Sequence, residues 1–266
     1  MKIAGLQKVS TIDYPGEICC VIFLWGCNFR CGFCYNPDLV VRDCEGNFSE
    51  EEFFDFLSKR VGKLDAVCIS GGEPLMTLDF GFVKKIKDMG FKVKLDTNGS
   101  FPGRLRELID LGLVDYVAMD VKSCREDYCG VTNVDVCLED IEESIRIVDE
   151  FGKGKINPRI CANGREFNEK ENNPRKSMDK HGQCYSEFRT TVVSGLHDLE
   201  SLRKMGEWMG EVCDGLPGRI FLQGFKVAKG GMIDNSFMEK ADVLEGELER
   251  LKGEICGLFG EVGVRV

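Results

Sequence analysis

The stretch ICCVIFLWGCNFRCGFCY, residues 18–35, joins an apolar run to a loop that carries Cys27, Cys31 and Cys34. A short, continuous apolar run bounded by a glycine is typical of a buried strand. Isolated free cysteines behave as small buried hydrophobes, but core packing does not explain three thiols on one turn. The stretch therefore predicts a buried strand whose carboxyl-terminal loop carries chemistry.

Strand and helix patterns alternate along most of the remaining chain. Further strands are predicted at 66–70, 91–96, 116–120, 188–193 and 219–223, with a capping box starting a helix at Ser49 and helices over 78–89, 104–111, 137–149 and 198–209. Repeated strand–helix units predict parallel strands with right-handed crossovers, so that all carboxyl ends lie on one side. We expect an α/β fold, a partial (βα)6 TIM-type barrel with parallel strands, that binds its ligands at those ends.

A single domain over residues 1–266 is predicted. Residues 152–186 are polar and too long for an ordinary connection, which indicates a mobile insertion or a lid, with mobility favoured. Apolar residues at helical spacing predict a C-terminal helix over 237–259 that packs on the barrel.

Composition excludes several classes of partner. The net charge is −10, with 45 acidic against 35 basic residues, which disfavours a nucleic-acid backbone. No apolar run approaches the roughly 18 residues that span a bilayer, and Met1–Gly5 lacks an apolar signal segment. We expect a cytoplasmic protein that binds neither nucleic acid nor membrane, whose 14 cysteines are reduced thiols, metal ligands or catalytic groups.

Two kinds of metal site fit the three-cysteine loop. A structural zinc site needs four Cys or His ligands, and Cys44 could supply the fourth, so zinc stays open. A 4Fe-4S cubane explains three thiolates better, because each holds one iron and the fourth iron keeps an open position. Such an iron can bind amino and carboxylate groups of a second molecule directly.

The pattern Cys27-x3-Cys31-x-Phe33-Cys34 resembles the cluster loop of the radical S-adenosylmethionine (SAM) enzymes, including the aromatic Phe33 before the third cysteine. The resemblance implies that SAM binds the open iron and is cleaved reductively to a 5'-deoxyadenosyl radical. The cofactor then performs the difficult step.

Residues 71–74, Gly-Gly-Glu-Pro, resemble the glycine-rich turn of the same family. Gly71 and Gly72 would permit close approach of the backbone to the cofactor, and Glu73, followed by Pro74, would receive the methionine ammonium. Taken alone, the tetrapeptide is more often a strand-to-helix turn.

The residues at two further strand ends, 96–99 and 120–122, resemble those of one group within this family, the glycyl-radical-enzyme activases. This resemblance implies that Asp96, Thr97 and Asp120 hold a monovalent cation and help place the cofactor, which Asn98 also contacts. Lys122 and Arg189 would face the cofactor or the substrate, although solvated charges are the commoner explanation for either residue alone. No side chain is expected to act as a general acid or base.

Residues 11–16, Asn36-Pro37 and residues 190–198 resemble the activating proteins of anaerobic ribonucleoside-triphosphate reductases, with Ser194 where proline is usual. The resemblance covers residues 1–150 and 187–226. It implies a glycyl-radical enzyme as partner, an anaerobic ribonucleotide reductase in the first instance, and an external reductant such as ferredoxin or flavodoxin. Pyruvate formate-lyase or another protein or small-molecule target remains open, as does an iron-sulfur electron carrier or a zinc-stabilised binding module.

Five more cysteines lie near or within the insertion: Cys124, Cys129, Cys137, Cys161 and Cys184. A second metal site among them is conceivable, but their spacing matches no metal-binding pattern. Free thiols are the favoured interpretation.

Overall fold

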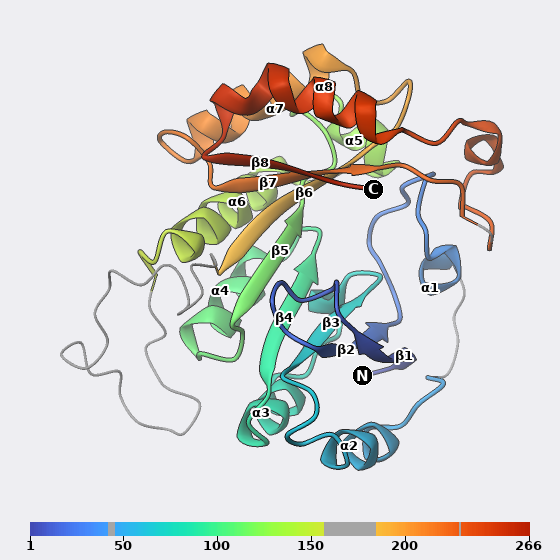
Figure 1. Cartoon of the computed structure of the whole chain (residues 1–266), viewed down its shortest axis with the longest axis vertical. Coiled ribbons are helices and arrows are strands. Elements are labelled where there is room, and N and C mark those ends of the chain that lie inside the picture. Colours follow the sequence, from blue (N-terminus) through green and yellow to red (C-terminus); the bar gives the residue numbers. More distant parts are fainter. Residues whose placement is uncertain (42–45, 157–184, 229) are drawn as a thin grey trace.

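The computed structural model describes residues 1–41, 46–156, 185–228 and 230–266, and its centre is one eight-stranded sheet in the order β1 to β8. The strands are β1 Ile3–Ser10, β2 Cys19–Leu24, β3 Ala66–Gly71, β4 Lys92–Thr97, β5 Tyr116–Asp120, β6 Ser186–Val192, β7 Arg219–Gly224 and β8 Glu261–Arg265. Strand β1 is antiparallel to β2, and every other neighbouring pair is parallel. Figure 1 shows β1 and β8 at the two ends of the curved sheet.

Helices connect the parallel strands and cover the outer side of the sheet (Figure 1). The α-helices are α1 Pro37–Val41, α2 Glu50–Ser58, α3 Phe80–Asp88, α4 Pro102–Asp110, α5 Tyr128–Thr132, α6 Leu138–Gly152, α7 Leu199–Val212 and α8 Glu245–Ile255, and the 3-10 turns are η1 Pro74–Met76, η2 Asn235–Glu239 and η3 Cys256–Leu258. None of the described helices has the length and apolar character needed to cross a membrane.

The predicted α/β fold with a parallel partial barrel is confirmed. All six predicted strands occur as parallel neighbours, and each strand end lies within two residues of its prediction. The capping box at Ser49 is also present: its hydroxyl accepts from the Glu52 backbone N–H at 3.1 Å, and the Glu52 carboxylate accepts from the Ser49 N–H at 2.8 Å.

The structure differs from the prediction at both ends of the sheet. Strand β1 was not predicted, and β8 is a seventh parallel strand, so the count of six was too low. The predicted continuous helix over 237–259 is wrong, because only α8 with the short η2 and η3 occupies that span. The backbone between η2 and α8 leaves the helical path where the N–H of Val243 donates to the carbonyl of Phe225 at 2.9 Å. Of the predicted insertion 152–186, residues 157–184 lie outside the described residues.

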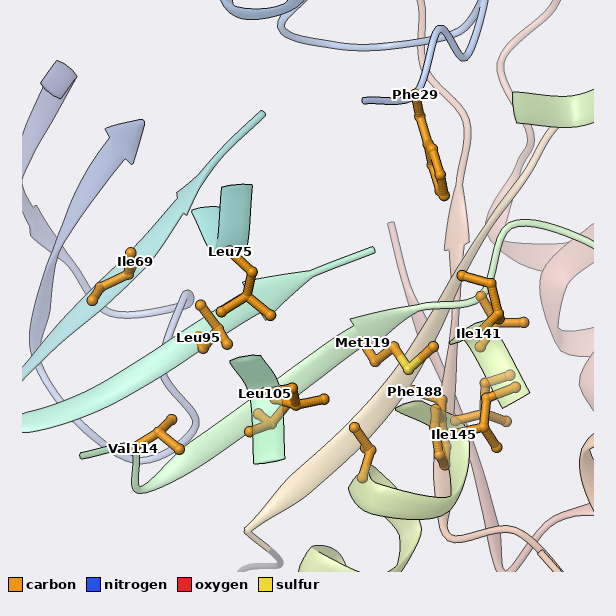
Figure 2. Packing of buried hydrophobic residues seen from close by; sticks show 14 of the residues in the cluster. Phe29, Ile69, Leu75, Leu95, Leu105, Val114, Met119, Ile141, Ile145 and Phe188 are labelled. Carbon is orange, nitrogen blue, oxygen red and sulfur yellow. The ribbon is translucent and has the colours of Figure 1, made fainter. Parts of the chain in front are cut away.

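The main core fills the space between the sheet and the helices. Ile69, Leu95 and Met119 of the sheet share this cluster with Leu105 of α4 and Ile145 of α6 (Figure 2). All five side chains are fully buried, and burial of one such side chain contributes about 1.5–3 kcal/mol. The core therefore fixes the outer face of the sheet, and the side chains that alternate with it point to the inner face.

The inner face combines a small apolar cluster with buried charges. The apolar cluster consists of Tyr14, Cys19, Val21, Ala66, Cys68, Tyr116 and Ala118. Next to it, Glu187 accepts two hydrogen bonds from the Arg265 guanidinium, at 2.7 and 2.6 Å, and one from the Tyr116 hydroxyl at 2.8 Å. This pairing links β5, β6 and β8 across the inside of the barrel.

We predict that Glu187→Gln destabilises the protein by about 2 kcal/mol at pH 7, because it removes a carboxylate that accepts charged hydrogen bonds in a buried position. Burial alone would raise the pKa of Glu187, but the hydrogen bonds from Arg265 and the charges of Arg189 and Lys94 lower it below its ordinary value. A carboxylate whose pKa is lowered on folding stabilises the folded state at pH values above its ordinary pKa. This stabilisation is lost as the pH falls from the ordinary pKa to the folded-state pKa.

Urea unfolding should therefore give a difference in unfolding free energy between the wild type and Glu187→Gln that is smaller at pH 4 than at pH 7. Glu261→Gln is the matched control, since Glu261 pairs with Arg219 at 2.8 Å but its side chain is 57% exposed. A difference of equal size at both pH values would contradict the stabilising role of the ionised Glu187 carboxylate.

Candidate functional site

The cysteine loop, residues 26–35, is held in place by three neighbouring segments. The N–H of Gly26 donates to the carbonyl of Leu39 at 2.9 Å, and the N–H of Glu73 donates to the carbonyl of Gly26 at 2.8 Å. The N–H of Arg30 donates to the carbonyl of Thr132, at the end of α5, at 2.9 Å. Phe29, 3% exposed, points from the loop toward the rest of the core (Figure 2), so packing holds the loop as well as hydrogen bonds.

A cavity of about 750 Å³ lies at the carboxyl ends of the strands. Most of the residues predicted for the site line it, namely Cys27, Phe33, Cys31, Cys34, Gly71, Gly72, Asp96, Thr97, Asn98, Asp120, Lys122 and Arg189. Glu73 and Pro74 are not among the lining residues. The topology therefore gathers residues separated by more than a hundred positions in the chain, as expected where parallel strands end together.

Glu73 lies behind the glycine turn, with no exposed surface. Its carboxylate accepts hydrogen bonds from the Thr97 hydroxyl at 2.8 Å, the Asn98 N–H at 2.6 Å and the Leu75 N–H at 3.0 Å. Burial nevertheless raises the pKa of Glu73 to about 7. In this structure Glu73 joins the end of β3 to the end of β4, and its predicted contact with the methionine ammonium stays a prediction.

Charged side chains from β4 to β6 form an ionic network along one side of the cavity, made of Lys94, Asp96, Asp120, Lys122 and Arg189. Arg189 contacts Asp96 at 3.4 Å and donates to Asp120 at 2.9 Å, Lys122 donates to Asp120 at 3.0 Å, and Lys94 pairs with Asp96. Burial raises the pKa of Asp120, but Arg189 and Lys122 lower it more, to about 2. Burial also raises the pKa of Asp96, but the charges of Arg189 and Lys94 lower it below its ordinary value. Both carboxylates are therefore ionised and paired with cations at neutral pH.

The predicted monovalent cation would have to share these oxygen atoms. Asp96 and Asp120 already have basic partners, and the Thr97 hydroxyl already donates to Glu73. A cation bound here would compete with Lys94 and Arg189 for the carboxylates. Its binding by Asp96, Thr97 and Asp120 remains a prediction.

The three thiols of the loop have the chemistry of metal ligands that need charge compensation. Burial raises the pKa of Cys27 to about 12, and it also raises the pKa values of Cys31 and Cys34. The charge of Lys122 opposes this shift at all three sulfur atoms. Metal binding deprotonates a thiol outright, so Lys122 would offset part of the negative charge that ligation creates.

The sulfur atoms of Cys27, Cys31 and Cys34 do not converge on one ion. Among the described residues, no three His, Cys, Asp or Glu side chains form a group that could hold a single metal ion. In a cubane each thiolate binds a different iron, so convergence on one point is not required. The three thiols come from one loop and line one cavity, which is the donor set that a cluster with one open iron needs. Cys44, which could have supplied a fourth zinc ligand, lies outside the described residues.

Three of the other cysteines near the insertion lie among the described residues, and their contacts are with residues other than cysteine. The Cys124 thiol donates to Asp127 at 3.3 Å, the Cys129 sulfur accepts from the Val136 N–H at 3.4 Å, and Cys137 is exposed. Cys161 and Cys184 lie outside the described residues. A second metal site gains no support from the part of the chain that the structure describes.

Several residues that line the cavity were missed by sequence reasoning, namely Lys94, Thr191, Gln223 and Arg265. Lys94 could have been found, because Lys92, Lys94 and Asp96 alternate along one strand and share its inner face. Arg265 was missed because β8 itself was not predicted.

Residues 21–169, more than half of the chain, match the family described as the radical SAM superfamily. The chain belongs to this family. It is 40% identical over 162 residues to a protein of Methanocaldococcus jannaschii named as a putative glycyl-radical enzyme activating enzyme, covering 58% of this chain and 64% of that protein. It is 31% identical over 137 residues to the pyruvate formate-lyase-activating enzyme of Listeria monocytogenes, covering 47% of this chain and 55% of that protein. The matched regions thus span less than two thirds of these relatives.

A solved structure supports the fold. The radical SAM enzyme coproporphyrinogen III oxidase of Escherichia coli superimposes with a TM-score of 0.50 at 11% identity, covering 89% of this chain and 50% of that chain. Members of the family use a 4Fe-4S cluster and SAM, and these are the cofactors of this chain. The three thiols and the cavity beside them fit that pair of cofactors.

We predict that Gly72→Ala impairs cluster assembly while the fold survives. A Cβ at position 72 would overlap the carbonyl group of Gly26 and lie 3.1 Å from the Cβ of Cys27, so the cysteine loop would have to move. Iron and sulfide per chain after anaerobic reconstitution should fall at least about twofold, since ligand geometry controls metal affinity. Gly103→Ala, where an added Cβ meets nothing within 4 Å, is the control, and equal iron content in the two variants would contradict the prediction.

Proposed function

We propose that this protein is a glycyl-radical-enzyme activase, in which Cys27, Cys31 and Cys34 hold the 4Fe-4S cluster and SAM occupies the adjoining cavity. The observation that carries the proposal is the single cavity lined by the three thiols, the glycine turn and the ionic network. The two relatives with activating-enzyme names support it. The target we propose is an anaerobic ribonucleotide reductase.

The cluster and SAM, when bound, supply one-electron reductive cleavage and a carbon radical able to abstract hydrogen. The residues of this chain bind these cofactors, orient them and shield the radical from water. Gly71 and Gly72 leave room for close backbone approach, Phe33 packs beside the thiols, and Asn98 and Thr97 present polar groups to the cavity. Enclosure limits the access of water to a reactive intermediate.

The ionic network itself carries one more positive than negative side chain. Lys94, Lys122 and Arg189 face two carboxylates, Asp96 and Asp120. One positive charge is left over, which suits the carboxylate of an amino acid such as the methionine part of SAM. We assign Lys122 and Arg189 this orienting role, and we assign no side chain the role of general acid or base.

Two segments that resemble the ribonucleotide reductase activators contribute to the cavity. Ile12 and Asp13, from residues 11–16, line it. His197, from residues 190–198, accepts from the Val193 N–H at 3.1 Å and hydrogen-bonds the Lys122 carbonyl at 2.8 Å through its other ring nitrogen. These contacts hold the backbone at Lys122, just after the end of β5. The segment 190–198 therefore supports a residue that lines the cavity.

Pyruvate formate-lyase is the second candidate target, because one relative is named for activating it. The cluster-binding loop does not distinguish the two, since a partner is recognised by the rim of the barrel and not by the cofactor. An external reductant such as ferredoxin or flavodoxin would supply the electron in either case.

The first test is whether the reconstituted and reduced protein converts SAM to 5'-deoxyadenosine and methionine under anaerobic conditions. We predict turnover by the wild type and a loss of at least about 100-fold in Cys31→Ala, because the cluster loses one of its ligands. Cys256→Ala, which changes an exposed cysteine far from the loop in sequence, should leave turnover unchanged. Cleavage by a variant without cluster, or none by wild type with four irons per chain, would contradict the mechanism, and the second result would favour an electron carrier.

The second test identifies the target. Incubation of the activated protein with anaerobic ribonucleotide reductase or with pyruvate formate-lyase should produce the electron paramagnetic resonance (EPR) doublet of a glycyl radical on the reductase only. A signal on pyruvate formate-lyase alone would replace the proposed target and leave the activase proposal in place.

A further inference from the structure

Three polar side chains form a closed ring of hydrogen bonds between the cysteine loop and the end of β4. The Asn98 amide nitrogen donates to Asn28 Oδ1 at 3.0 Å, and the Asn28 amide nitrogen donates to Ser100 Oγ at 2.9 Å. The Ser100 hydroxyl donates to Asn98 Oδ1 at 2.6 Å and so closes the ring. Each member is held by the other two.

The ring allows only one orientation of the Asn98 amide. Its Oδ1 also accepts from the backbone N–H of Ser100 at 3.0 Å. A flipped amide would place its carbonyl oxygen against Asn28 Oδ1 and its NH₂ group against the Ser100 N–H, and both contacts would be lost. The nitrogen of Asn98 therefore faces the cysteine loop.

That nitrogen lies 4.0 Å from the sulfur atom of Cys27. An amide NH₂ group has two hydrogens, and the ring uses one of them, so the second is available to the sulfur. The same sulfur accepts from the backbone N–H of Phe29 at 3.4 Å. A thiolate is a stronger acceptor than a thiol, because hydrogen bonds to ionised groups are stronger.

The backbone of Asn98 is fixed as firmly as its side chain. Its N–H donates to the buried Glu73 carboxylate at 2.6 Å, and only 6% of Asn98 is exposed. The amide is thus tied both to the end of β4 and, through Asn28, to the residue next to Cys27. This combination is typical of a group that tunes a ligand and not of a surface hydrogen bond.

We propose that Asn98 is a positioning residue that donates an N–H to the Cys27 sulfur and raises the reduction potential of the 4Fe-4S cluster, with Asn28 and Ser100 orienting its amide. The inference rests on the assignment of Cys27 as a cluster ligand. Reduction places additional negative charge on the cluster and its sulfur ligands, and a donor aimed at one of them stabilises the reduced form.

The test is a redox titration of the reconstituted cluster followed by EPR, without SAM and without a partner enzyme. In Asn98→Ala the ratio of reduced to oxidised cluster at a fixed solution potential should fall about three- to tenfold, the effect of one lost hydrogen bond. Asn98→Asp keeps the shape but replaces the donor with a negative acceptor, so its ratio should fall further. The EPR signal comes from the reduced cluster alone, so each titration is normalised to its own fully reduced signal, and a lower iron content in a variant then does not change the ratio.

Asn133→Gly is the matched control. Asn133 also ties the cysteine loop through an amide, donating to the Arg30 carbonyl at 3.1 Å, but within the described part of the chain its amide has no hydrogen bond to sulfur. Glycine suits its backbone, which has a φ of +55°. The ratio should stay at the wild-type value in this variant.

An unchanged ratio in both Asn98 variants, or an equal fall in Asn133→Gly, would overturn the proposal. Because the titration needs neither SAM nor a target enzyme, an unchanged ratio leaves the activase proposal standing. Conversely, failure to form a glycyl radical on a partner would not affect the redox titration of the cluster.

Discussion

The buried Glu73 is the point on which the geometry of the site depends. Its backbone N–H holds the Gly26 carbonyl of the cysteine loop, and its carboxylate holds Thr97 and Asn98 at the end of β4. One residue therefore joins the ends of three neighbouring strands, β2, β3 and β4. A buried carboxylate is costly unless its lone pairs are satisfied, and the three donors around it meet that need. The positions of Cys27 and Asn98 relative to each other follow from this arrangement.

The ionic network imposes a second constraint. Burying five charged side chains on the inner face is tolerable only because each has a partner of opposite sign. Because Asp120 pairs with both Lys122 and Arg189, the ends of β5 and β6 are coupled electrostatically as well as through their ladder.

The sequence was most informative where burial dominates. Strands β2, β3 and β5 are largely apolar runs between turn residues, and their prediction succeeded because a buried parallel strand has little choice of composition. Strands β4 and β6 place charged or polar residues between apolar ones, so the strand–helix alternation along the chain identified them as well as their composition. Strand β8 was not predicted because Glu261–Arg265 follows directly on a helical pattern and is too short to be recognised alone. The predicted helix over 237–259 failed because its apolar periodicity comes from two elements, with Phe237 in η2 and Leu248 in α8. At the site, the family motifs predicted most of the lining residues, but not that the Glu73 carboxylate accepts hydrogen bonds from the end of β4. A carboxylate's direction depends on the donors around it, and Thr97 is brought to Glu73 only by the pairing of β3 with β4.

The open order of the sheet has a mechanical consequence. Strands β1 and β8 end the described sheet, and Arg265 of β8 and Asp13, just beyond β1, line the same cavity from its two ends. In a closed barrel, widening the mouth would break a ladder of backbone hydrogen bonds. In this open sheet, a small change of twist distributed over the seven strand pairings would separate the two edges without breaking any pairing. A molecule wider than the cavity would therefore have to work against the bending stiffness of the sheet and not against a ladder of backbone hydrogen bonds.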